Sequence, residues 1–418
     1  MAPSTLAMLA AGLLPLLHLA SGAVVPGPEL EAACAPVPSA SKYPSWSKLP
    51  RQTTMPDPFL PLADTTTNNA NGSATFAQDI SDGKGKNRIQ TPEEWYQCRQ
   101  PEIVQMLQDY HQETVKATRS GNTIEIEVTA GKKTGTFRAT LSLPSNASRS
   151  EPAPVVINIG GMKNDPYLEA GIAIVGFDYS SVASDSNART GAFWDIYAGR
   201  DIGSLTAWAW GFHRTLDALN MTVPEIDSTR VGVTGCSRLG KGALAAGLFD
   251  ERITLTMPMS SGVQGLGPYR YHALSGQDET LENSKQGAPW WSDNTLGTFM
   301  NHSEHLPYDS HTIAAALAPR ALIIDQGIDD PFTNSEATAV IVYPAARLVY
   351  EFLGVKDKIG MSVRSGGHCD MSGYDSVLPF VTHILQNTTL TKDYNDLSSY
   401  GGAMTAAYPW ATAIPKPA

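Results

Sequence analysis

The stretch VGVTGCSRLGKGAL, residues 231–244, decides the fold that we expect for this chain. A run rich in β-branched residues ends at Gly235, a serine follows at position 237, and small, helix-favouring residues come next. A strand that turns sharply into a helix presents one side chain at the crest of the turn, and hydrolases expose a nucleophilic serine in this way. The usual G-x-S-x-G form is absent, because Gly235 and Gly240 enclose one residue more. A serine hydrolase also needs a base, an acid and donors for an oxyanion elsewhere in the chain.

The first residues and the bulk composition indicate a secreted globular protein. An apolar run from Leu6 to Ala20 is followed by small residues, which predicts a signal peptide over residues 1–23. Hydrophobic residues make up 42% of the 418 residues and charged residues 17%, as in globular chains. The net charge of −11 disfavours nucleic acid and anionic membranes as partners. No later run reaches the roughly 18 apolar residues of a membrane span, and with no sign of an oligomer interface we expect a monomer.

Cysteines and glycosylation sequons support the same location. An even number of cysteines in a secreted chain predicts two disulfides, for which three connectivities exist. No two cysteines are closely spaced, which disfavours zinc, and we expect no metal. The cysteines are Cys34, Cys98, Cys236 and Cys369. The N-x-S/T sequons are at Asn71, Asn146, Asn220, Asn301 and Asn387.

The ends of the chain differ in pattern from its middle. Residues 24–92 are rich in Pro, Ser, Thr and Asn and predict a segment that wraps a core. A helix over 93–110 begins the predicted catalytic domain, which extends over 93–390. The tail over 391–418 shows no periodicity, and its order is left open.

Within the predicted domain, an antiparallel hairpin over 123–130 and 134–143 precedes short apolar runs that alternate with helical patterns. The apolar runs predict strands at 153–160, 170–179, 230–235, 253–261, 321–326 and 359–365. The helical patterns lie at about 203–219, 238–250 and 335–353. This alternation predicts an α/β fold with a mostly parallel sheet covered by helices on both faces. Residues 264–312 form a long insertion, which we expect to act as a lid or binding surface.

A candidate acid and a candidate base follow the serine in the order that this type of sheet requires, which is serine, acid, histidine. Asp330 lies in the loop after the strand at 321–326, with Asp329 as the alternative. His368 lies on a glycine-rich loop after the last strand. Taken alone, an Asp-Asp-Pro is typical of a turn and a Gly-Gly-His of a solvated loop. The three in order, each at a strand end, favour the triad Ser237-His368-Asp330.

Neighbours of the serine and histidine add detail to this site. Cys236 precedes Ser237 and Cys369 follows His368, so a hydrogen bond between serine and histidine would bring these cysteines close enough to form a disulfide. Cys34 and Cys98 would then form the second disulfide. The Arg238 N–H and guanidinium are positioned for an oxyanion, with a second donor from residues 158–161. Lys241, one helical turn further on, could face the pocket, but the residues alone favour a solvated surface charge.

The stretch GCSRLGKGA, residues 235–243, resembles the G-C-S-R-N-G-K-G-A signature of the glucuronoyl esterases, carbohydrate esterase family 15. The resemblance extends to SLTAWAWGFHRTLDALN before the serine, APRALIIDQGID near the acid, and the GGH loop followed by cysteine. It implies an α/β-hydrolase fold without metal or cofactor. It also implies cleavage of esters between 4-O-methyl-glucuronic acid on xylan and lignin alcohols. Ser237 would be the nucleophile, His368 the base, Arg238 the oxyanion stabiliser and Lys241 a ligand of the sugar hydroxyls.

The chain departs from the family pattern at several positions. Many members have the acid in a P-Q-E-S-G stretch, where this chain has Ser260, so Asp330 is the expected acid. In the insertion, Gly287 replaces a sugar-contacting glutamate, while Trp290 remains as a stacking candidate. Pro331 stands where a tryptophan is expected. These differences leave two alternatives open: an esterase for another acyl group on plant polysaccharide, or an inactive carbohydrate-binding descendant.

Overall fold

A computed structural model describes residues 113–272 and 278–414, together with 66–68, 74–76, Glu94 and Cys98. The chain divides into two compact units, one up to Gln112 and one from Glu113 onward. In the first unit, β1 (Thr66–Asn68) and β2 (Ala74–Phe76) form an antiparallel pair. The predicted signal peptide, most of the wrapping segment and nearly all of the helix over 93–110 lie outside the described residues. No helix in the described ranges is long and apolar enough to cross a membrane.

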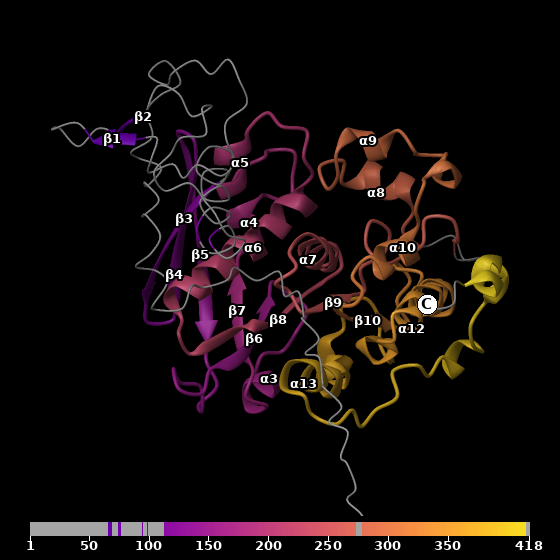
Figure 1. The fold of residues 1–418 in the computed structure, drawn as a ribbon. Helices are drawn as coiled ribbons and strands as arrows, with labels where there is room; N and C mark the ends of the chain where they lie inside the picture. The colour runs from indigo at the N-terminus through magenta and orange to yellow at the C-terminus, as the bar shows by residue number, and fades with distance from the viewer. Residues whose placement is uncertain are drawn as a thin grey trace, which may run out of the picture. The chain divides into compact units, whose positions relative to one another are not determined.

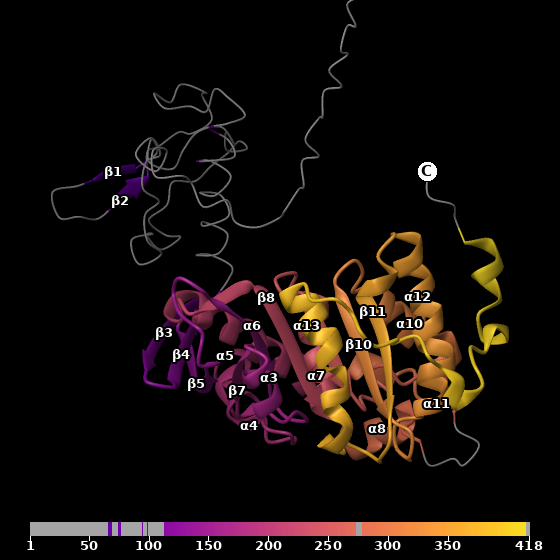
Figure 2. The ribbon, with the colours of Figure 1, turned by 90° about the horizontal axis from the view of Figure 1, so that it is seen from below.

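The second unit is built on a nine-stranded sheet with the order β11-β10-β9-β8-β6-β7-β5-β4-β3 (Figures 1 and 2). Neighbouring strands from β11 to β7 in this order are parallel, and those from β7 to β3 are antiparallel. The strands are β3 (Thr114–Ser120), β4 (Thr123–Ala130), β5 (Lys133–Ser142), β6 (Ala153–Asn158), β7 (Ala173–Phe177), β8 (Ile226–Cys236), β9 (Leu255–Met259), β10 (Ala321–Gly327) and β11 (Ile359–Arg364).

Burial explains why most of these strands could be predicted. The residues of β9 and β10 are buried throughout, as expected for parallel strands covered on both faces. The predicted hairpin is confirmed as β4 and β5, whose buried residues alternate with exposed ones. The edge strand β3 was not predicted, because its residues TVKATRS are half-buried at most and give no apolar signal.

Helices cover the two faces of the sheet (Figure 2). On one face, α6 (Ser204–Thr222), α7 (Arg238–Phe249) and α12 (Tyr343–Phe352) pack against the strands. On the other face lie α3 (Asp165–Glu169) and α13 (Leu378–Gln386). The three predicted helices are confirmed as α6, α7 and a continuous segment that ends with α12. A short stretch of π-helix, residues Thr338–Val342, precedes α12 in that segment.

The insertion and the tail are built from short helices. The insertion contains α8 (Leu281–Gly287), α9 (Asn294–Gly297) and the start of α10 (Ser310–Ala315). Residues 391–414 contain three short 3-10 helices, Ser398–Tyr400, Thr405–Ala407 and Pro409–Ala413. Leu397 and Tyr408 are buried in the cluster that also contains residues of α12. The predicted bounds 93–390 and 391–418 remain predictions.

Candidate active site

The serine of the opening stretch lies at the sharp turn between β8 and α7. Ser237 has φ 57° and ψ −128°, a left-handed conformation that costs a non-glycine residue roughly 1–3 kcal/mol. Its N–H donates to the Met259 carbonyl at 2.9 Å, which ties the turn to the end of β9. A Cβ added at Gly235 would lie 2.5 Å from the Leu239 carbonyl oxygen. The turn is therefore strained and held from both sides, as in a nucleophile elbow.

A histidine and a buried aspartate form a hydrogen-bonded pair at the ends of β11 and β10. His368 Nδ1 lies 2.9 Å from Asp330 Oδ2, and this oxygen also accepts from the Thr333 hydroxyl at 2.8 Å. The other carboxylate oxygen accepts from the Phe332 N–H at 2.9 Å. Burial opposes ionisation, but the hydrogen bonds from His368 and Phe332 lower the pKa of Asp330 below its ordinary value. Asp330 is therefore an ionised partner suited to hold an imidazole in one orientation.

The alternative acid, Asp329, has a different environment. It is exposed, and its carboxylate accepts only a backbone bond, from the Gly366 N–H at 3.3 Å, among the contacts described. The histidine bond is made by Asp330 alone of the two. The order of residues along the chain could not separate these neighbours, whereas their burial does.

The disulfide predicted beside the site is present. Cys236 and Cys369 are bonded, with their Cα atoms 5.8 Å apart. The bond joins the residue before Ser237 to the residue after His368, so the serine turn and the histidine loop lie next to each other. Cys98 is also disulfide-bonded, while Cys34 lies outside the described residues, so the Cys34–Cys98 pairing remains a prediction.

Asp185 connects the serine turn to the insertion, and sequence reasoning missed it. One carboxylate oxygen lies 2.5 Å from Arg238 Nε. The other accepts hydrogen bonds from the indole N–H groups of Trp290 and Trp291, each at 2.7 Å. Asp185 lies in a polar loop between α4 (Tyr179–Val182) and α5 (Ala192–Tyr197), with no motif around it that would have indicated this role.

Lys241 is buried, so the expectation of a solvated surface charge is wrong. Only 2% of the residue is exposed, and Nζ donates to Glu279 Oε2 at 2.5 Å and to the Val263 carbonyl at 2.6 Å. The ammonium also lies 5.3 Å from the centre of the Trp291 ring. Burial lowers the pKa of Lys241, and the Glu279 carboxylate opposes that shift. Glu279 is a second partner that the sequence did not reveal, because it comes from the insertion.

The position where many family members have the acid is occupied by a buried serine. Ser260 is fully buried and has a positive φ of 45°. Its hydroxyl lies 3.4 Å from Arg364 Nη2, and the same guanidinium makes a buried ion pair with Asp325, Nε to Oδ1 at 2.7 Å. Position 260 thus has no carboxylate to offer the histidine.

Two further observations concern the residue after Pro331 and the glycosylation sequons. The ring of Phe332, which is 55% exposed, lies edge-on to His368 with a centroid separation of 5.3 Å, so an aromatic side chain adjoins the histidine one residue after Pro331. Four sequon asparagines, Asn146, Asn220, Asn301 and Asn387, are exposed, whereas Asn71 lies outside the described residues.

A serine on a strand-to-helix turn, a histidine paired with a buried aspartate and a mostly parallel sheet define an α/β-hydrolase. The family model "Glucuronyl esterase, fungi" matches residues 126–354, more than half of the chain. The chain belongs to this family.

Relatives and solved structures agree with this membership. A "4-O-methyl-glucuronoyl methylesterase" of Podospora anserina is 36% identical over 68% of this chain, which spans 62% of that relative's length. A carbohydrate esterase family 15 glucuronoyl esterase from Caldicellulosiruptor kristjansonii is 32% identical, with a TM-score of 0.64 over 84% of this chain and 96% of that one. A serine-to-alanine mutant of the Sporotrichum thermophile glucuronoyl esterase, in complex with methyl 4-O-methyl-β-D-glucopyranuronate, is 27% identical. Its TM-score is 0.65 over 87% of this chain and 96% of that one.

Proposed function

We propose that this chain is a secreted serine esterase that hydrolyses esters of 4-O-methyl-glucuronic acid, the esters that link xylan to lignin alcohols. The observation that most directly supports this proposal is the hydrogen bond between His368 and Asp330. His368 lies on a loop that a disulfide joins to the strained turn at Ser237. The names of the relatives and the glucuronate ester bound in a related structure support the choice of acyl group.

In the proposed reaction, the Ser237 hydroxyl attacks the ester carbonyl while His368 Nε2 removes its proton. Asp330 keeps the other ring nitrogen protonated and stabilises the imidazolium that forms. The alcohol leaves with the proton from His368 and an acyl-enzyme remains. Water then attacks the acyl group with His368 again acting as the base, and Ser237 recovers its proton as the glucuronate leaves.

The oxyanion of each tetrahedral intermediate would be stabilised by Arg238 through its backbone N–H and its guanidinium. The loop after β6 would supply the second donor. A Cβ added at Gly161 would lie 2.7 Å from Cys236 Cβ, so this loop packs directly against the serine turn. Preorganised donors of this kind are each worth roughly 3–4 kcal/mol to the transition state.

The sugar would lie between the serine turn and the insertion, against Trp290 and near Lys241. Trp290 is partly exposed, and its indole is oriented by Asp185. Glu279 holds the Lys241 ammonium in place, so its one remaining N–H would be the donor for a sugar hydroxyl.

A second candidate function keeps the machinery and changes the acyl group. A Cβ at Gly287 would meet no atom within 4 Å, so the side of α8 that carries a sugar-contacting glutamate in the family is open here. An acetyl or aromatic ester on plant polysaccharide would need no such contact. The inactive-descendant alternative is disfavoured by the three hydrogen bonds that hold the Asp330 carboxylate.

The test is hydrolysis of benzyl glucuronate and methyl 4-O-methyl-glucuronate by the secreted protein, by Ser237→Ala and by Ser260→Ala. Turnover should vanish in Ser237→Ala and stay within a few-fold of wild type in Ser260→Ala. Cleavage of acetyl or feruloyl esters alone would support the second candidate. No turnover of any ester would overturn the enzyme proposal.

A further inference from the structure

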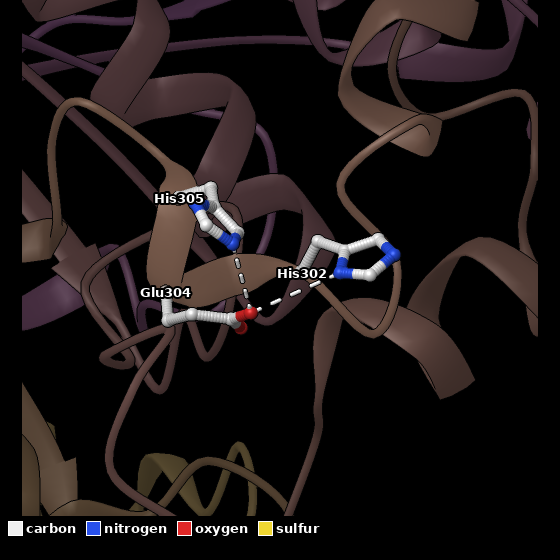
Figure 3. Close-up of side chains that lie close together, drawn as sticks. All are labelled: His302, Glu304 and His305. Carbon is white, nitrogen blue, oxygen red and sulfur yellow. Dashed lines mark ion pairs between the residues drawn. The ribbon is translucent and has the colours of Figure 1, made fainter.

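A turn in the insertion brings two imidazoles and a carboxylate together, none of which is among the residues assigned to catalysis (Figure 3). His302 Nδ1 lies 3.8 Å and His305 Nε2 3.4 Å from the same oxygen of Glu304. One ligand atom from each of the three residues lies within 4.8 Å of the others. Among the residues that the structure describes, no other set of three or more His, Cys, Asp or Glu side chains converges in this way.

We propose that His302, Glu304 and His305 bind a divalent cation of the zinc class. Zinc bonds imidazole nitrogen and carboxylate oxygen at about 2.0–2.2 Å in tetrahedral geometry, which separates the ligand atoms by roughly 3.3–3.6 Å. The two nitrogen-to-oxygen separations, 3.8 and 3.4 Å, are close to this range. The two imidazole nitrogens lie within 4.8 Å of each other, so rotation of the exposed side chains would bring them to the distance that zinc requires. Water would fill the fourth position.

The ligand types determine which cation fits. Imidazole nitrogen suits Zn²⁺, Cu²⁺ and Ni²⁺, whereas Mg²⁺ and Ca²⁺ require mainly oxygen ligands. The single carboxylate supplies one negative charge, and the two imidazoles bind the cation in their neutral form. All three side chains are exposed, so a cation reaches them without opening the fold.

The backbone around the turn is anchored, which limits the ordering cost of binding. The Arg270 guanidinium donates to the carbonyls of Leu306 at 2.5 Å and Tyr308 at 2.8 Å, directly after the turn. Leu306 itself is buried in an apolar cluster of the insertion. Before the turn, the Asn301 N–H donates to the Glu282 carboxylate at 2.6 Å. The ligands therefore project from a turn that is fixed on both sides.

The decisive experiment is calorimetric titration of ZnCl₂ into the secreted full chain, without a polyhistidine tag and after treatment with a chelator. We expect one ion per chain and no comparable binding of MgCl₂. Loss of a residue that only orients a zinc ligand typically weakens affinity roughly 10–100-fold, so His305→Asn and Glu304→Gln should each weaken it at least tenfold. The visible spectrum of bound Co²⁺ gives a second readout of the same ligands.

Two variants serve as matched controls. Ser303→Ala leaves all three ligands in place while removing the sequon that begins at Asn301, and it should keep the wild-type affinity. His272→Asn removes an exposed histidine outside the turn and should also keep the wild-type affinity for zinc. The proposal is overturned if wild type binds no stoichiometric zinc, or if either control weakens binding as much as His305→Asn. Ester hydrolysis should be unchanged in His305→Asn, so the result is independent of the proposed function.

Discussion

The neighbouring carboxylates Asp329 and Asp330 provide the sharpest test of the proposed triad. Replacing Asp330 by Asn leaves the ring of His368 free to adopt the wrong tautomer, so kcat/KM for benzyl glucuronate should fall by roughly 10³–10⁴. Asp329→Asn changes an exposed side chain of the same size and charge, and should stay within a few-fold of wild type. Steady-state kinetics of both variants measure the difference. An equal loss in the two would remove Asp330 from the triad.

Asp185 is the residue whose importance only the structure reveals. In Asp185→Ala, the Arg238 guanidinium loses its carboxylate partner and the indoles of Trp290 and Trp291 lose their shared acceptor. Misplacement of such groups by about 1 Å can cost on the order of 100-fold in rate, so we expect a lower kcat together with a higher KM. Asp185→Asn keeps one acceptor oxygen and should give an intermediate loss in the same assay. Wild-type values for both variants would mean that Arg238 and the tryptophans are held by other contacts.

At the scale of elements, the disulfide between the end of β8 and the loop after β11 should contribute to both stability and activity. The bond spans 133 residues, and closure of so long a loop is worth roughly 2–5 kcal/mol. The double variant Cys236→Ala/Cys369→Ala should lose stability of this order in denaturant unfolding. Its kcat should also fall, because His368 would no longer be tied to the serine turn. If the double variant keeps the wild-type stability and the wild-type kcat, packing alone positions His368.

Backbone hydrogen bonds join the start of α6 to the insertion, and a substitution at Gly203 should disturb them. The N–H groups of Ser204 and Leu205 donate to the carbonyls of Trp290 and Trp291 at 2.8 and 3.1 Å. A Cβ at Gly203 would lie 2.1 Å from the Trp291 carbonyl oxygen, which is backbone and cannot move alone.

Gly203→Ala should therefore displace the insertion, raise KM for glucuronate esters and lower the melting temperature. Gly287→Ala, at the end of α8, is the matched control because its added methyl group meets no atom within 4 Å. Kinetics and thermal unfolding of the two variants provide the comparison. If Gly203→Ala behaves like Gly287→Ala, the contact between α6 and the insertion does not position the substrate.

Local pattern explains which parts of the fold and site could be predicted. The buried strands β6 to β11 are short apolar runs, and the helices α6 and α7 have apolar residues at helical spacing. The serine, aspartate and histidine follow a fixed order along a sheet of this type. Asp185, Glu279 and Arg364 carry no such signal. Each reaches its partner from a loop, the insertion or a strand end, so only tertiary packing shows the contact. The burial of Lys241 could not be predicted for the same reason, because its partner is Glu279.

For the whole molecule, the four sequons that are exposed in the described part of the chain and the net charge of −11 are consistent with the proposed secretion. Asn146, Asn220, Asn301 and Asn387 are exposed and lie in separate segments of the chain, so glycans at these positions would not enter the core. The acidic charge and the exposed glycan sites would both favour solubility.

The free energy of unfolding should depend on pH through two buried carboxylates, Asp325 and Asp330, which titrate in different pH ranges. Burial raises the pKa of Asp325 from 3.8 to about 6, and Arg364 opposes this shift without cancelling it. Between about pH 4 and 6 the folded state then holds a proton that the unfolded state has lost. The free energy of unfolding therefore falls as the pH rises through this window, by on the order of 3 kcal/mol. Asp330 has a lowered pKa, so its contribution is present above about pH 4 and is lost as the pH falls further.

Denaturant unfolding of wild type, Asp325→Asn and Asp330→Asn at pH values from about 3 to 7 separates the two contributions. Between pH 4 and 6, Asp325→Asn should lose less stability than wild type, because the position no longer titrates. The stability difference between wild type and Asp330→Asn should stay constant above about pH 4 and shrink below it. Asp325→Asn also changes the contacts of the buried Arg364 guanidinium at every pH, so only the slope of stability against pH is diagnostic. If the free energy of unfolding of Asp325→Asn falls with pH as steeply as that of wild type, then Asp325 stays ionised throughout this range and its ion pair with Arg364 outweighs the effect of burial.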